Sequence, residues 1–343
     1  VDNTVIEIVL TIADTNEIKR QPALAIDVGS TWISFGADMI SDMNLYDSAT
    51  VPVGVSRVNR QNKVVPYLAS DALQVATIGF IGDTTKPTML EFDFNFETEQ
   101  ITLLFSETVY VSSLVTTGIT LYSGDPVTPG YQQYRLTGGD IINPTVDSTK
   151  VMLQLTFADL NEVKYRTDML ATPSAMHLEL DADAIMDMRS NGILGNSLIN
   201  TAVSCANDGG STHQLGSIFE TTPTMLVTPS EPVDCPYSAA VTLTTDVTNP
   251  TLEQADLNMD SATAVLTLRF SETVNPDSLV VTNIVLQRAS TTATTTDQSH
   301  QLTGGEITAV SRTVISILLT HDDMNEIKRK RALVASPESS YIS

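Results

Sequence analysis

Cysteine, aromatic residues and basic residues are all scarce in this chain. Its 343 residues include two cysteines, 6% aromatic residues, and 18 lysines and arginines against 41 acidic residues, for a net charge of −23. This excess of negative charge repels phosphate groups, so we expect no nucleic-acid partner and no anionic membrane surface as partner. No apolar run approaches the roughly 20 residues that a membrane helix needs, so we also expect no membrane insertion.

Catalytic signatures are lacking as well. A hydrolase needs a positioned base, usually histidine, yet the four histidines form no Ser-His-Asp or Cys-His set. No pair of cysteines or histidines has the spacing of zinc ligands. We therefore expect a protein that is not an enzyme and that needs no cofactor, with calcium as the one candidate ion.

What the chain does contain is a large repeat. The pattern Leu-Thr-x-x-Asp-x-Asn-Glu-Ile/Val-Lys begins at Leu10, Leu155 and Leu319. The segment LLFSETV (103–109) recurs as LRFSETV (268–274), and RLTGGDI (135–141) recurs as QLTGGEI (301–307). Repeats of this kind belong to proteins whose units stack on, or extend from, their neighbours.

The repeat spacing predicts modules of domain size. The asparagines of the first pattern, Asn16, Asn161 and Asn325, are 145 and 164 residues apart, within the usual size range of a domain. The segments DTTKPT (83–88) and DVTNPT (246–251) are interpreted as linkers. We predict the C-terminal part of a module at 1–82, a complete module at 83–245 and the N-terminal part of a module at 246–343.

Residues 1–34 align without gaps on residues 310–343, so the outer modules are partial and overlap in content. Two explanations are open. The chain can be an excerpt of a longer multi-repeat polypeptide, or the half-modules of adjacent chains can complete one another head to tail. The overlap weakens the second explanation, because both ends would compete for one position.

The repeat also helps to interpret two chemical motifs. AIDVGST (25–31) matches the phosphate loop of actin-like and sugar-kinase ATPases, but the corresponding segments of the other copies keep neither its aspartate nor its glycine. His321 aligns with Phe157 and Ile12, so we expect that position to be a packing position. Neither motif supports catalysis.

Strand signals dominate the local pattern. Segments such as EQITLLF, KVMLQLTF and TVISILLT alternate or run apolar, are rich in Val, Ile, Leu and Thr, and are separated by turn residues. The clear helical element is the triplicated segment around ADLNEVK, where Thr156 is placed to cap the helix and Asp159 follows three residues later. We predict an all-β fold of β-sandwich modules, each with one short helix.

Three segments carry a resemblance to a known family. FSETVNPDSLVVTNIVL (270–286), DADAIMDMRSNGI (181–193) and the two linkers resemble the bacterial-type immunoglobulin-like repeats of large extracellular surface proteins, which also occur in algae and protists. Arg189 and Ser190 depart from the usual small residues of the second segment. The resemblance implies tandem immunoglobulin-like modules in stalks, adhesins, surface layers or filaments, and an extracellular or cell-surface location.

Aspartates are the candidate ligands for calcium, which prefers hard oxygen donors. Asp183 and Asp187 recur as Asp38 and Asp42, Asp181 adds a carboxylate, and Asp83 and Asp246 lie in the linkers. The alternative is that these aspartates cap turns through their own backbone.

Connecting segments contain one expected modification and one candidate modification. Cys205 and Cys235 flank a long insertion, and a disulfide between them is favoured over two buried free thiols. The Thr-rich segment 289–299 is a candidate for O-linked sugars, but a flexible polar loop is the favoured interpretation. The candidate threonines there are Thr291, Thr292, Thr294, Thr295 and Thr296.

These expectations converge on a structural role, as a repeat segment of an extracellular filament or cell-surface appendage. The expected partners are copies of the chain or neighbouring repeat modules, joined head to tail or laterally. The alternative is an adhesin-type module that recognises a surface glycan or protein through the loops 123–133 and 205–235.

Overall fold

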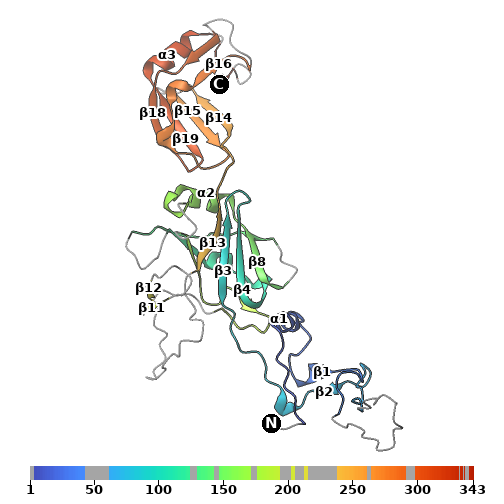
Figure 1. Ribbon diagram of the computed structural model, residues 1–343. Coiled ribbons are helices and arrows are strands. Elements are labelled where there is room, and N and C mark those ends of the chain that lie inside the picture. The colour runs from blue at the N-terminus through green and yellow to red at the C-terminus, as the bar shows by residue number, and fades with distance from the viewer. Residues whose placement is uncertain are drawn as a thin grey trace, which may run out of the picture.

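The structure is a computed structural model of the 343-residue chain, and Figure 1 shows its parts in sequence order, strung end to end. It describes residues 4–42, 62–123, 130–142, 147–170, 176–193, 202–204, 212–214, 238–260, 264–290, 298–331, 333–334, 336 and 340–343. Strands make up most of the regular structure, which confirms the prediction of a mainly β fold.

Residues 83–245 form one nine-stranded sheet. Its hydrogen-bonded order is β6-β5-β9-β13-β3-β4-β8-β7, and β10 pairs with β4. The strands are β3 (Met89–Asn95), β4 (Gln100–Tyr110), β5 (Ile119–Tyr122), β6 (Gln133–Arg135), β7 (Asp140–Ile141), β8 (Ser148–Gln154), β9 (His177–Leu180), β10 (Met186–Asp187) and β13 (Ser238–Thr244). A separate two-stranded sheet joins β11 (Ala202–Ser204) and β12 (Thr212–Gln214). Strand β13 is the central connector, because it pairs antiparallel with β9 and parallel with β3.

Residues 246–343 repeat this arrangement without a counterpart of β13 among their described residues. The order β14-β15-β19-β18 reproduces β3-β4-β8-β7, and β17-β16-β20 reproduces β6-β5-β9. The strands are β14 (Leu252–Asn258), β15 (Val265–Phe270), β16 (Val285–Gln287), β17 (Ser299–Gln301), β18 (Gly305–Ala309), β19 (Val314–Leu319) and β20 (Tyr341–Ile342).

The first 82 residues contain counterparts of the later elements of the repeat. Strand β1 (Trp32–Ile33) corresponds to β9 and pairs antiparallel with β2 (Leu73–Gln74), as β9 pairs with the start of β13. The α-helices of the three copies are α1 (Ile12–Arg20), α2 (Phe157–Tyr165) and α3 (His321–Arg329). Short 3-10 helices cover Val28–Ser30, Thr77–Gly79, Val111–Ser113, Thr116–Gly118, Thr167–Leu170, Pro276–Ser278 and Val281–Asn283.

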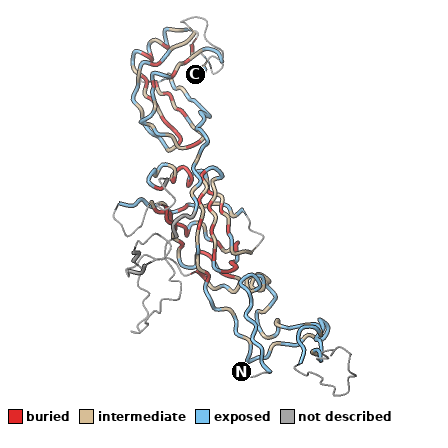
Figure 2. The backbone as a smooth tube through the Cα atoms, viewed as in Figure 1, coloured by how far each residue is buried: buried red, intermediate tan, exposed pale blue. Residues whose placement is uncertain are grey.

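Two separate hydrophobic cores hold the later parts together. One cluster of buried side chains runs from Phe92 to Ile193, and a second runs from Ala264 to Leu333. Figure 2 shows both as buried segments, whereas the described residues of 1–82 are intermediate or exposed. Trp32 and Ile78, for example, are 53% and 99% exposed. Hydrophobic burial therefore stabilises the middle and last parts far more than the first.

Each helix is capped as the sequence predicts. Thr156 accepts a hydrogen bond from the backbone N–H of Asp159, and Thr11 and Thr320 do the same in the other copies. The Asp159 carboxylate is buried and accepts hydrogen bonds from the Tyr134 hydroxyl and from Thr137. This explains the repeated Leu-Thr-Gly-Gly segment, because its backbone closes over the aspartate of the helix.

The second glycine of that segment is required by its backbone. Gly139 has φ of +136°, and a Cβ there would lie 2.8 Å from a strand carbonyl, that of Gln154. Gly305 repeats this situation, with φ of +158° and a carbonyl at 2.8 Å, that of Leu318. Both features exclude other side chains, because an L-residue at positive φ is strained and the space is filled.

Candidate inter-module junction

The most distinctive cluster of charged residues lies between the second and third parts of the chain. Lys164, at the end of α2, places its Nζ 2.6 Å from Asp246 Oδ2 in the linker and 2.6 Å from Glu272 Oε2, just after β15. The lysine side chain is only 11% exposed. Beside it, the Thr273 hydroxyl donates to the backbone carbonyl of Asn161, at 2.9 Å. One helix thus holds both the linker and the next module.

The same cluster is built a second time between the first and second parts. Lys19 of α1 lies 2.9 Å from Asp83 Oδ2 and forms an ion pair with Glu107. The Thr108 hydroxyl donates to the carbonyl of Asn16 at 2.9 Å. We call these two clusters the first junction (Asn16, Lys19, Asp83, Glu107, Thr108) and the second junction (Asn161, Lys164, Asp246, Glu272, Thr273).

The serine of the repeated Phe-Ser-Glu-Thr segment forms hydrogen bonds with the linker. Ser106 Oγ accepts from the N–H of Thr88 at 3.0 Å, and Ser271 Oγ accepts from the N–H of Thr251 at 2.9 Å. The backbone N–H of each serine also donates a hydrogen bond to the backbone carbonyl of the same threonine. The serine, glutamate and threonine of this segment therefore all serve the joint.

The second junction has further contacts around the lysine. Glu162 Oε1 accepts from Arg312 Nε at 2.9 Å, and the Arg312 guanidinium lies over the Tyr165 ring, 3.3 Å from its centroid. A cleft of about 340 Å³ opens beside Lys164, walled in part by Phe96, Leu243 and Pro250. The joint is therefore a polar contact beside an open cleft, unlike the hydrophobic cores of the two parts that it connects.

At the second junction, burial and the ion pairs have opposite effects on the pKa values of the lysine and the two carboxyl groups. Burial alone would lower the pKa of Lys164, but its bonds to Asp246 and Glu272 outweigh that effect and raise it. Burial raises the pKa of Glu272, and Lys164 only partly offsets this rise. Burial also opposes ionisation of Asp246, but hydrogen bonds, above all from Lys164, outweigh it and lower its pKa. One ammonium is thus shared between two carboxylates.

The first junction shows the same opposition. The pKa of Lys19 is raised, since its bonds to Glu107 and Asp83 outweigh the effect of burial. The pKa of Glu107 is also raised, because burial exceeds the stabilisation that Lys19 provides, and nearby Asp83 and Asp187 add repulsion. Here one ammonium pairs with two carboxylates, Asp83 and Glu107, and a third carboxylate, that of Asp187, lies close to both.

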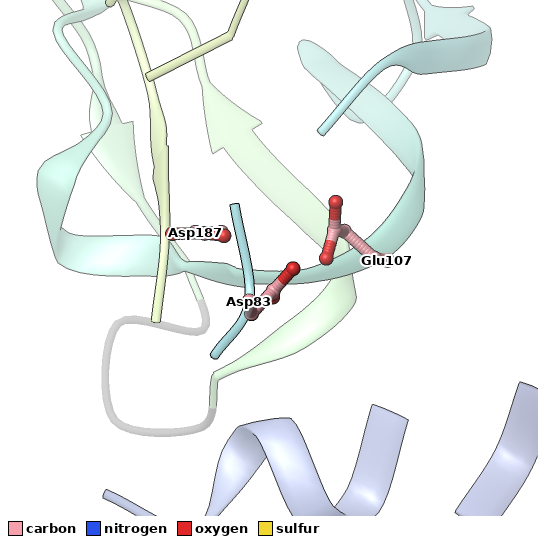
Figure 3. A group of neighbouring side chains, drawn as sticks. All are labelled: Asp83, Glu107 and Asp187. Carbon is pink, nitrogen blue, oxygen red and sulfur yellow. The ribbon is translucent and has the colours of Figure 1, made fainter. Parts of the chain in front are cut away.

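Those three carboxylates form the clearest candidate metal site among the described residues. Each of Asp83, Glu107 and Asp187 offers an oxygen within 4.8 Å of the others, and Figure 3 shows the side chains converging. Asp187 is held by the backbone N–H and the side-chain amide of Asn191. Oxygen donors suit calcium, but the Lys19 ammonium already provides a positive charge at Asp83 and Glu107.

The structure brings together two of the seven aspartates predicted to bind calcium, Asp83 and Asp187. Of the remaining five, Asp246 binds Lys164 across the second junction, Asp38 pairs with Lys63, and Asp181 pairs with Arg135. Asp42 accepts from the backbone and side chain of Asn62, and Asp183 has positive φ in a turn. Four of these five aspartates thus bind residues 20 to 82 positions away in the sequence. Turn capping, the alternative interpretation, is found at Asp83, Asp187 and Asp246, which accept from the backbone N–H of Thr85, Arg189 and Thr248. Calcium binding stays a prediction.

Several other predicted features lie outside the described residues. These are Cys205 and Cys235, the candidate glycosylation threonines Thr291, Thr292, Thr294, Thr295 and Thr296, and most of the two variable loops. The predictions about them stand as they were made.

One packing prediction is wrong. Phe157 and Ile12 are 56% and 77% exposed, and His321 is exposed as well. The reason is that the first residue of each helix faces away from the core, and Phe157 instead lines a cleft with Arg312 beside the second junction. In AIDVGST, Asp27 accepts from the N–H of Ser30, so the phosphate-loop lookalike is a capped turn.

The acceptor residues Glu107 and Glu272, and the lysines that bind them, are not among the residues singled out from the sequence. The available signal was that three motifs, each repeated, carry complementary charges: the lysine of the helix, the aspartate of the linker and the glutamate of Phe-Ser-Glu-Thr.

In the described part of the chain, no helix is both long and apolar enough to cross a bilayer.

Comparisons with known proteins do not show a family for this chain. No family model matches it, and no curated protein matches it. Among solved structures, a fragment of S. aureus TarS (217–571) has 12% identity and a TM-score of 0.15, covering 72% of this chain and 60% of that one. A longer TarS chain has 10% identity and a TM-score of 0.14, with 75% and 39% covered. A marsupial T cell receptor has 10% identity and a TM-score of 0.17, with 71% and 90% covered.

Proposed function

We propose that this chain is a non-catalytic structural segment of an extracellular filament or cell-surface appendage, of the flagellar-hair, stalk or surface-layer type. In this proposal its units are immunoglobulin-like β-sandwich modules. The four- and three-stranded sheets of residues 246–343 form the two layers, and in residues 83–245 β13 joins the corresponding strands into one hydrogen-bonded sheet. The observation that carries the proposal is the repetition of the junction, since the same five residue types join two successive pairs of modules.

The mechanism is mechanical. Contacts between modules of one chain are usually small and permit relative motion. A buried lysine bound to the linker and to the next module gives one orientation a lower free energy than the others, because turning the modules would leave carboxylates unpaired in a partly desolvated site. Repeating the joint repeats the orientation, which is what an ordered fibre needs.

Helix α3 offers the same residues for a further joint. Asn325 and Lys328 correspond to Asn161 and Lys164, and both are exposed. Their chemistry fits another module that presents a linker aspartate and a Phe-Ser-Glu-Thr segment. The expected partner is thus a neighbouring repeat module joined head to tail.

Electron microscopy of the protein as isolated from its source tests the proposal. Ordered filaments with an axial repeat of one or two modules are the expected result. Dispersed flexible strings of beads would contradict it and would favour the adhesin alternative, with ligands sought for the variable loops.

A further inference from the structure

In the middle part of the chain, β13 lies between β9 and β3 and pairs with both. We call the position between these two strands the slot. Residues Ser238 and Ala239 of β13 pair antiparallel with β9, and the following residues pair parallel with β3. The polar anchor of this pairing is Asp93, whose carboxylate accepts from both the backbone N–H and the hydroxyl of Thr242, at 3.1 and 2.6 Å. The next residue, Leu243, pairs with Phe94 and packs against the core.

The third part contains the same slot. Strand β14 pairs with β15 in the same register as β3 pairs with β4, and both pairs have a bulge near the start of the first strand. Asp256 and Leu257 therefore take the positions of Asp93 and Phe94. Strand β20 takes the position of β9. Among the described residues, no strand pairs with the edge of β14 that faces away from β15.

The walls of the slot are exposed as a result. Six of the seven residues of β14 are exposed, whereas β3 has two buried residues and only one exposed. A cleft of about 450 Å³ lies between β14 and β20, with Asp256, Leu257, Leu286 and Ile342 among its lining residues. Among the described residues, the Asp256 carboxylate accepts hydrogen bonds only from the amide of Gln254, on its own strand.

The first part of the chain contains a two-residue strand, β2, that pairs as the start of β13 does. Gln74 pairs with Trp32 of β1 as Ala239 pairs with His177 of β9. Counting forward from these pairs, Thr77 takes the place of Thr242 and Ile78 the place of Leu243. Ile78 is 99% exposed. A threonine followed by an aliphatic residue is therefore shared by the two segments in sequence, although Thr77 and Ile78 lie in the 3-10 helix Thr77–Gly79, beyond the end of β2.

We propose that the cleft between β14 and β20 binds the closing strand of a repeat module, an extended segment running parallel to β14. Its threonine lies opposite Asp256 and donates both its N–H and its hydroxyl, and its next residue is aliphatic and covers Leu257. Strand addition to an open sheet edge provides the main-chain hydrogen bonds, and the side chains provide the selectivity. This inference rests on the proposed function, since it names the partner by which a module of the fibre is completed.

A peptide covering residues 236–246, labelled for fluorescence anisotropy, tests the binding with the full chain. We expect it to bind, and we expect a Thr242→Val peptide to bind about tenfold more weakly through the loss of the hydroxyl bond to a carboxylate. Asp256→Ala in the protein should weaken binding to a similar extent. Asp93→Ala is the matched control, since it changes the slot that β13 already fills.

Absence of peptide binding would overturn the inference, and so would loss of binding in Asp93→Ala but not in Asp256→Ala. A peptide of residues 72–82 that binds equally well, together with self-association of the chain that either peptide reverses, would support the cleft and identify a second copy as the source of the strand. Peptide binding by a protein that forms no filaments would retain this inference and reject the proposed function. Filaments without peptide binding would reject this inference and retain the proposed function.

Discussion

The sharpest test of the junction replaces Lys164 by methionine. Methionine keeps most of the length and apolar volume of the lysine stem but removes the charge, which leaves Asp246 and Glu272 without their shared ammonium. The matched control is Lys328→Met, the same position of the repeat on α3, where the side chain is exposed. Both variants change the net charge equally, so their difference isolates the junction.

The expected magnitude follows from the exposure of the three side chains. Removing one partner of a fully buried ion pair costs about 3–5 kcal/mol, because the remaining charge is uncompensated. At the second junction the side chains of Lys164, Asp246 and Glu272 are 11%, 24% and 12% exposed, so solvent screens part of the loss. We expect Lys164→Met to cost about 2 kcal/mol of unfolding free energy and Lys328→Met less than about 0.5 kcal/mol.

Urea unfolding followed by circular dichroism measures these costs, and small-angle scattering reports whether the joint has become more mobile. The deficit of Lys164→Met should also shrink on acidification. Without the ammonium, the native carboxylates have raised pKa values, so the native state takes up protons that the unfolded chain does not, and stability relative to wild type rises as the pH falls from 7 towards 4. Equal costs for the two variants, or a deficit independent of pH, would refute the reasoning.

Three other changes test the repeat. Asp159→Ala should cost about 3 kcal/mol in urea unfolding because it leaves buried donors unpaired, whereas the exposed counterpart Asp14→Ala should cost less than about 1 kcal/mol; equal losses would contradict this. Gly139→Ala should lower the melting temperature by about 5 °C or more and Gly138→Ala by far less, since only the first meets a carbonyl at positive φ; similar shifts would reject the steric argument. Millimolar calcium, compared with chelator, should leave the wild-type melting temperature unchanged but raise that of Lys19→Met by about 3 °C, as calcium replaces the missing ammonium; an equal rise in wild type would contradict this.

Local structure was largely readable from the sequence. The alternating segments predicted β4, β8 and β19, and the triplicated helix was predicted together with its capping threonine. These features depend on residues that are close in the sequence, because the spacing of hydrophobic residues and the chemistry of helix caps act over a few positions. The repeat itself was visible because identical residues recur at module-sized spacing.

Tertiary structure decided which of the repeated residues meet. Lys164 binds Glu272 across 108 positions, and no local pattern announces such a contact, since its geometry depends on how one module is placed on the next. The same reason explains the wrong prediction for Phe157, whose apolar character predicted burial although the helix turns it outward. The sequence by itself determined the strands, the helices and the unit of repetition. Only the fold decided that three repeated motifs form one joint and that no described strand pairs with the outer edge of β14.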